Sequence, residues 1–109
     1  MTERTTNTAH TVPIDEQGEI ARFQIVRSGI SRRKVVSLNI DGEATADYAV
    51  DVGGEDANGD INWFDNEETY DDTDDVSDAW VQSDQWLRIR VTDPAPDDND
   101  ATLLVSEGR

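Results

Sequence analysis

The chain has 109 residues, enough for one domain with a single modest core. Asp and Glu number 25 against 9 Lys and Arg, which gives a net charge of -16. The chain has no Cys, which excludes disulfides and thiolate metal sites, and no apolar run approaches the roughly 18 residues of a membrane helix. We therefore expect a soluble protein without a cleaved signal and without a membrane or nucleic-acid partner, because this negative charge repels phosphate.

The acidic composition predicts a protein that works in very high salt. Asp outnumbers Glu by 17 to 8, and Lys34 is the only Lys. The Debye length falls from about 10 Å at 0.1 M salt to about 3 Å at 1 M, so molar salt removes most of the self-repulsion. The profile resembles proteins of haloarchaea and their viruses. The alternatives are an acidic nucleic-acid mimic and a disordered acidic protein.

Residues 1–12 are polar and Thr-rich, and we expect them to form a flexible N-terminal arm before a domain over residues 13–109. From about residue 19 onward, apolar residues alternate with polar ones, which is typical of half-buried strands. The alternating sets are Ala21, Phe23 and Ile25; Val36, Leu38 and Ile40; Ala46, Tyr48, Val50 and Val52; Leu87, Ile89 and Val91; and Ala101, Leu103 and Val105. With short strands at Ile61–Phe64 and Trp80–Val81, this pattern predicts a single all-β domain, an antiparallel β-sandwich of jelly-roll type.

Turn residues separate the expected strands at Asp41-Gly42, Gly53-Gly54, Asn58-Gly59 and Asp93-Pro94. The segment from Gly53 to Asp60 resembles a calcium loop but lacks its ligand order, so a hairpin turn at Asn58-Gly59 is the favoured interpretation.

Eight acidic residues between Asp65 and Asp78 predict a solvated loop. We expect no cofactor and no specific metal site, only weak, non-specific cation association.

The sequence predicts no enzymatic activity and no catalytic residue. The only His is His10, which lies in the polar N-terminal stretch. No set of nucleophile, base and orienting group is visible, and no phosphate-binding loop is present.

Candidate partner-binding residues fall in two groups. Arg32, Arg33 and Lys34 belong to a basic N-terminal third of net charge +2, whereas residues 35–109 carry -18. They are predicted either to pair with carboxylates of a neighbouring molecule or to be three exposed charges at a turn.

The second group is Trp86, Arg88 and Arg90, which point away from the apolar face of their strand and are predicted to meet a partner. Trp63 is expected in the core. Stacking of the tryptophans on sugars is the alternative.

From Tyr48 onward, the chain has a strand, the turn segment Asp56-Ala57-Asn58-Gly59, a strand with Trp63, and a strand ending Arg88-Ile89-Arg90-Val91-Thr92. This layout resembles small β-sandwich structural modules of tailed viruses, of the head decoration, turret or tail type. The resemblance covers about the last 60 residues. With the salt signature, it implies a non-enzymatic virion protein of a haloarchaeal virus, made in the host cytoplasm. Its expected partners are capsid or tail proteins of the same particle, with a homo-oligomer as the expected state. The alternative is a carbohydrate- or surface-binding module of a halophilic archaeon.

Overall fold

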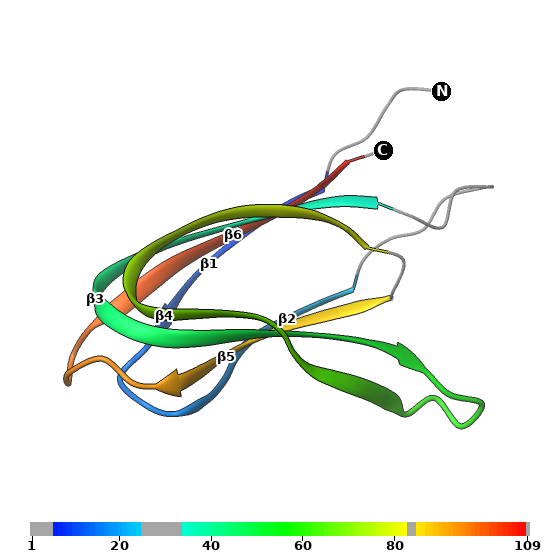
Figure 1. The fold of residues 1–109 in the computed structure, drawn as a ribbon, viewed down its shortest axis with the longest axis horizontal. Coiled ribbons are helices and arrows are strands. Elements are labelled where there is room, and N and C mark those ends of the chain that lie inside the picture. The colour runs from blue at the N-terminus through cyan, green and yellow to red at the C-terminus, as the bar shows by residue number, and fades with distance from the viewer. Residues whose placement is uncertain (1–5, 25–33, 83–84, 109) are drawn as a thin grey trace.

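A computed structural model of the protein describes residues 6–24, 34–82 and 85–108. Every regular element in these ranges is a β-strand, and all strand pairs are antiparallel, which confirms the all-β expectation. The strands are β1 (Thr6–Pro13), β2 (Gly18–Gln24), β3 (Lys34–Glu55), β4 (Ile61–Gln82), β5 (Trp86–Asp93) and β6 (Asp100–Gly108). Figure 1 shows β3 and β4 as a long hairpin that curls back on itself.

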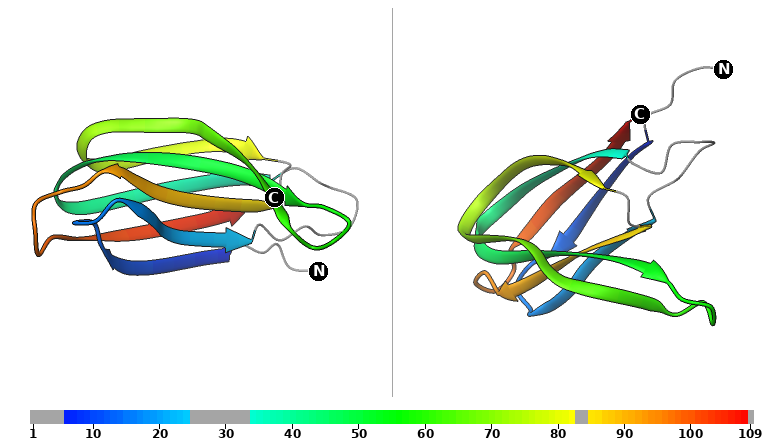
Figure 2. Two further views of the ribbon diagram at one scale, coloured as in Figure 1. Left: turned by 90° about the horizontal axis from the view of Figure 1, so that it is seen from below. Right: turned by 45° about the vertical axis from the view of Figure 1, so that its right-hand side comes forward.

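The six strands form one sheet in the order β1-β6-β3-β5-β2, with β4 paired to β3 as well. The first part of β3 pairs with β6 from Val35 to Gly42, and the last part pairs with β5 from Asp47 to Gly53. The sheet therefore curls into a half-barrel with two walls, as the views in Figure 2 show. A β-sandwich or jelly roll is not confirmed, because the same two long strands run through both walls.

The core lies between the two walls and contains the apolar residues that the alternating pattern predicted. Leu38 and Leu103 come from one wall, Val50 and Ile89 from the other, and all four are fully buried. Each fully buried Leu, Val or Ile contributes about 1.5 to 3 kcal/mol to folding. The period-two pattern thus correctly identified the inward face of β3, β5 and β6.

The expectation of a loop from Asp65 to Asp78 is wrong, because β4 runs unbroken through this segment. The expected short strands at Ile61–Phe64 and Trp80–Val81 are the two ends of this one strand. Because β4 has β3 as its only partner among the described strands, it is an edge strand. An edge strand has solvent along one side of its backbone, so its charged side chains can stay hydrated. The many acidic residues of β4 therefore do not prevent this segment from forming a strand.

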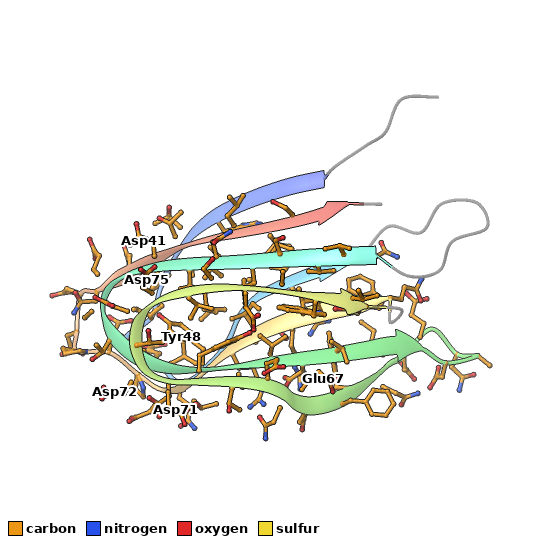
Figure 3. All side chains as sticks on the ribbon, turned by 45° about the horizontal axis from the view of Figure 1, so that its top comes forward. Asp41, Tyr48, Glu67, Asp71, Asp72 and Asp75 are labelled. Atoms are coloured by element: carbon orange, nitrogen blue, oxygen red, sulfur yellow. The ribbon has the colours of Figure 1, made fainter. Side chains whose placement is uncertain are left out.

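The expected turn at Asp41-Gly42 is also wrong, because β3 continues through it and bends. Figure 3 shows Asp71, Asp72 and Asp75 around this bend, with Tyr48 nearby. A Cβ atom on Gly42 would lie 3.1 Å from the carbonyl oxygen of Ala44 and 3.3 Å from the Tyr48 hydroxyl. Gly42 therefore allows close packing within the bend rather than reversing the chain.

The hairpin turn expected at Asn58-Gly59 is confirmed, because β3 ends at Glu55 and β4 begins at Ile61. The turn expected at Gly53-Gly54 is wrong, because both glycines belong to β3 and pair with β4. The Asp56 carboxylate accepts hydrogen bonds from the amides of Asn58, at 2.8 Å, and Asp60, at 3.1 Å. Gly59 has a φ of 85°, which favours glycine. The Asp56 side chain thus stabilises the turn itself.

The expectation of a flexible arm over residues 1–12 is wrong for residues 6–12, which belong to β1. This strand pairs with β6 from Thr6↔Glu107 to Pro13↔Asp100. Thr-rich segments have high strand propensity, and the ladder to β6 supplies the hydrogen bonds that the sequence alone did not reveal. Residues 1–5 lie outside the described residues.

Candidate interaction site on the outer sheet face

The outer face of the wall formed by β2, β5 and the ends of the β3–β4 hairpin carries a connected group of charged and aromatic side chains. Asp51 alternates with the core residues Val50 and Val52, so its side chain lies on the face opposite the core. The sheet register places Asp51 opposite Arg88 and Ala49 opposite Arg90. The side chains of Asp51 on β3 and of Arg88 and Arg90 on β5 therefore meet on the outer face of the sheet.

Asp51 is the centre of this group and is fully buried. Its carboxylate accepts hydrogen bonds from Nε of Arg88 at 2.5 Å, from Nε of Arg90 at 2.6 Å and from Nη2 of Arg90 at 3.0 Å. The backbone amide of Asn66 adds a fourth hydrogen bond at 2.8 Å. A buried charge is tolerated only when it is paired and hydrogen-bonded, and Asp51 meets both conditions.

Two residues of β4 extend the network toward solvent. Arg88 donates from Nη2 to the carboxylate of Asp65 at 2.9 Å, and Arg90 donates from Nη2 to the side-chain oxygen of Asn66 at 2.8 Å. Asn66 has a φ of 59°, a conformation that Asn adopts more readily than most residues. The network therefore ties β4 to β5 across the intervening β3.

Trp63 covers the end of the network, on the outer face rather than in the expected core. The Arg88 guanidinium lies 4.4 Å from the centre of the Trp63 ring, and that of Arg22 lies 5.3 Å from it, both within cation–π range. A Cβ atom on Gly53 would lie 3.1 Å from the Trp63 ring and 2.4 Å from the carbonyl oxygen of Asn62. Gly53 is therefore required for Trp63 to lie close against the sheet.

The arginines determine the ionisation of Asp51. Burial alone would raise its pKa, but the hydrogen bonds from Arg90 and Arg88 dominate and lower the pKa from 3.8 to about 2. The bond to Asp51 in turn raises the pKa of Arg90. The pair is thus charged over the whole physiological range.

The predicted partner-binding residues have different environments in the structure. Arg88 and Arg90 are largely covered, with 18% and 26% of their side chains exposed, and both are bonded within the chain. Trp86 is half-buried, and its Nε1 donates to the Glu55 carboxylate at 3.2 Å. Whether these residues meet a partner stays a prediction.

Of the other predicted group, Arg32 and Arg33 lie outside the described residues. Lys34 is the first residue of β3, where its backbone lies opposite that of Gln82. The prediction that Arg32, Arg33 and Lys34 contact a partner therefore stays a prediction.

Sequence reasoning missed Asp51, Asp65, Asn66 and Arg22 as members of this site. The sequence did contain a signal for Asp51. Asp51 lies between the apolar residues Val50 and Val52, just as Arg88 lies between Leu87 and Ile89, so both side chains are expected on the outer face. The alternation does not specify which strands are neighbours, so the pairing of Asp51 with Arg88 needed the register.

The described part of the chain contains no group of three or more His, Asp or Glu side chains arranged to hold a metal ion. No helix in these same residues is long and apolar enough to cross a membrane.

The fold and the site define a small all-β module, a single curled sheet with a charged network on one outer face. No family model and none of the curated proteins compared matches the sequence. Among solved structures, the fold is similar to the crystal structure of SPBc2 prophage-derived protein YomS, with a TM-score of 0.58 and 11% sequence identity. The similarity covers 100% of this chain and 98% of that chain. At this identity the likeness shows the fold alone.

Proposed function

We propose that the protein is a non-enzymatic structural component of a virus particle, of the head decoration, turret or tail type. The observation that carries this proposal is the similarity of the whole chain to a prophage-derived protein, with almost no residue of either chain left over. A fold by itself does not define a function, and the proposal therefore also rests on what the surface offers.

The surface supports a role in contacts rather than in chemistry. A hollow of about 480 Å³ where the chain passes from β1 to β2 is lined by apolar residues, Val12, Pro13 and Ile20, and by three carboxylates, those of Asp15, Glu16 and Glu19, and its lining includes no His, Ser or Thr. The lining thus offers no hydroxyl, thiol, amine or imidazole group that one of these carboxylates could activate as a nucleophile. In the Asp51 network, the charged groups are already bonded to one another and hold the sheet together.

The register supports a function in concentrated salt. Asp41 lies directly opposite Asp75, and Asp47 directly opposite Asp93. Like charges directly opposite each other destabilise a strand pair. Molar salt screens this repulsion, so we assign the particle to a halophilic virus. The particle would assemble in the host cytoplasm. The partners of this chain would be capsid or tail proteins, including further copies of the chain itself.

The proposal is tested on particles released from cells that carry this sequence. Particles banded in a density gradient at molar salt should contain the chain in a fixed ratio to the major capsid protein, measured by quantitative mass spectrometry. Treatment that opens the particles and removes the nucleic acid should leave the chain with the protein shell. A chain that stays in the cell lysate and never bands with particles would rule out the virion role.

The second candidate is a carbohydrate- or surface-binding module of a halophilic archaeon. The observation that favours it is the position of Trp63 and Trp86 on either side of Gly53 on the same outer face, since Gly53 is in register with both. Tryptophans on a flat sheet face can stack on sugar rings. Quenching of tryptophan fluorescence by soluble cell-surface glycans at molar salt, lost in Trp86→Ala, would support this candidate.

A further inference from the structure

The curled sheet has three edges among the described strands. β1 pairs with β6 alone, β2 with β5 alone and β4 with β3 alone. Each of these strands therefore presents one side of its backbone that is not paired within the sheet. Unpaired strand edges are places where another strand can add, and proteins that stay monomeric protect them with charges, bulges, prolines or cover.

Two of the three edges carry such protection. β4 has eight acidic residues between Asp65 and Asp78. β2 has a register irregularity between Glu19 and Ala21, and its charged residues Glu19 and Arg22 form an ion pair of 2.9 Å. A second copy that added to either edge would meet charges or an irregular backbone.

The β1 edge is different. Residues 6–13 read Thr-Asn-Thr-Ala-His-Thr-Val-Pro and contain no Asp, Glu, Lys or Arg, in a chain where 31% of residues are charged. Its register with β6 runs without a bulge over all eight positions, and the only protective residue is Pro13 at its end. Thr and Val also have high strand propensity.

We propose that β1 is an interaction edge at which a second copy of this chain adds its own β1, antiparallel, so that the two sheets become continuous. The inference deepens the proposed function and rests on it for the biological role, because it assigns the surface through which copies associate. Antiparallel addition of like strands is self-complementary and gives a two-fold dimer. Pairing of the seven residues from Thr6 to Val12 would span about 24 Å.

Two observations favour a second copy as the occupant: antiparallel strand edges are self-complementary, and β1 is an edge at which two such acidic chains can meet without opposing charges. Two chains of net charge -16 repel each other wherever carboxylates meet. In molar salt the Debye length of about 3 Å is shorter than the strand spacing of about 4.8 Å, so only charges in direct contact still matter. The β1 edge places no formal charge in that contact. The same dimer should dissociate in dilute salt, where the whole surfaces repel.

The absence of Cys from the chain allows a clean cross-linking test. Single-cysteine variants at each position from 6 to 12 are oxidised at molar KCl and analysed on non-reducing gels. Opposite residues of antiparallel strands have Cα atoms about 4.5 or 5.5 Å apart, within the reach of a disulfide. Wherever the two-fold axis falls on β1, at least one of these positions lies near its own copy.

The matched control is Thr69→Cys, since Thr69 and Thr11 are both exposed residues on edge strands. At least one β1 variant should form a disulfide dimer about tenfold faster than Thr69→Cys, because pairing raises the local thiol concentration. Equal rates for all variants, or faster dimer formation by Thr69→Cys, would overturn the proposal.

A second test uses charge and the mass in solution. Thr11 and Thr102 are exposed neighbours whose Oγ1 atoms lie 3.4 Å apart, but Thr102 is on β6, one strand away from the edge. Light scattering at molar KCl should show a dimer that Thr11→Glu weakens about tenfold and Thr102→Glu leaves nearly intact. A wild-type monomer at high concentration contradicts the proposal. Particle incorporation is measured separately, so a monomer that still enters particles would sink this inference and leave the proposed function standing.

Discussion

Replacement of Asp51 by Asn tests the physical account of the outer-face network most directly. Asp51→Asn keeps the shape and one acceptor but removes the charge that Arg88 and Arg90 share. Both guanidiniums remain mostly covered and lose their counter-ion, and breaking a buried pair in this way costs about 3 to 5 kcal/mol. Because the arginines are partly exposed, at 18% and 26%, we expect the low end, about 3 kcal/mol.

The pKa of Asp51 gives an independent magnitude. A carboxyl with a pKa of 3.8 when unfolded and about 2 when folded contributes about 2.5 kcal/mol of stability near neutral pH. Because the folded-state pKa is the lower one, this contribution is complete above about pH 5, begins to fall near the unfolded pKa of 3.8 and is lost as the pH falls through 2. The stability difference between wild type and Asp51→Asn should therefore shrink over this range.

The assay is urea unfolding at molar KCl, followed by circular dichroism and tryptophan fluorescence. Urea is used because guanidinium chloride is itself a salt. The matched control is Asp65→Asn, which also removes one acidic partner of Arg88. Because the Asp65 side chain is 60% exposed, its loss should cost less than about 1 kcal/mol.

Equal losses in the two variants would refute the reasoning, because the charge change on the chain is the same and the two carboxylates differ in burial and in the number of hydrogen bonds that they accept. A wild-type advantage over Asp51→Asn that stays constant from pH 6 to pH 2 would refute it as well. The salt dependence gives a third check. The cost of Asp51→Asn should change little with dilution, since buried pairs are screened much less than exposed ones.

Three further outcomes follow from the surface and the sheet. Dilution from molar to about 0.1 M salt should lower the free energy of unfolding by several kcal/mol, and an unchanged melting temperature by circular dichroism would contradict this. Gly53→Ala should destabilise by about 2 kcal/mol in urea titrations, because its Cβ would lie 2.4 Å from the Asn62 carbonyl oxygen, whereas Gly54→Ala, with open space around it, should be nearly neutral. Trp86→Ala should reduce incorporation into particles while the variant still unfolds in one cooperative transition in urea, and normal incorporation would show that Trp86 is not a contact.

The sequence by itself determined the all-β class and the inward face of most strands. Leu87, Ile89 and Val91 are buried as their alternation predicted, because side chains on a strand alternate between its two faces whatever the neighbouring strand is. The turn at Asn58-Gly59 was also predictable, since Gly adopts a positive φ without strain.

Only the tertiary structure decided where strands continue and which of them are neighbours. The polar segments of β1 and β4 read as an arm and a loop, because an edge strand is held by backbone hydrogen bonds to one neighbour and needs few apolar side chains. Asp51 is charged by sequence, but its burial depends on a register that brings two arginines from β5 onto it. Strand pairing brings together residues that are far apart in the chain, and a local sequence pattern does not specify which strands pair or in which register. The site could therefore be recognised only from the folded sheet.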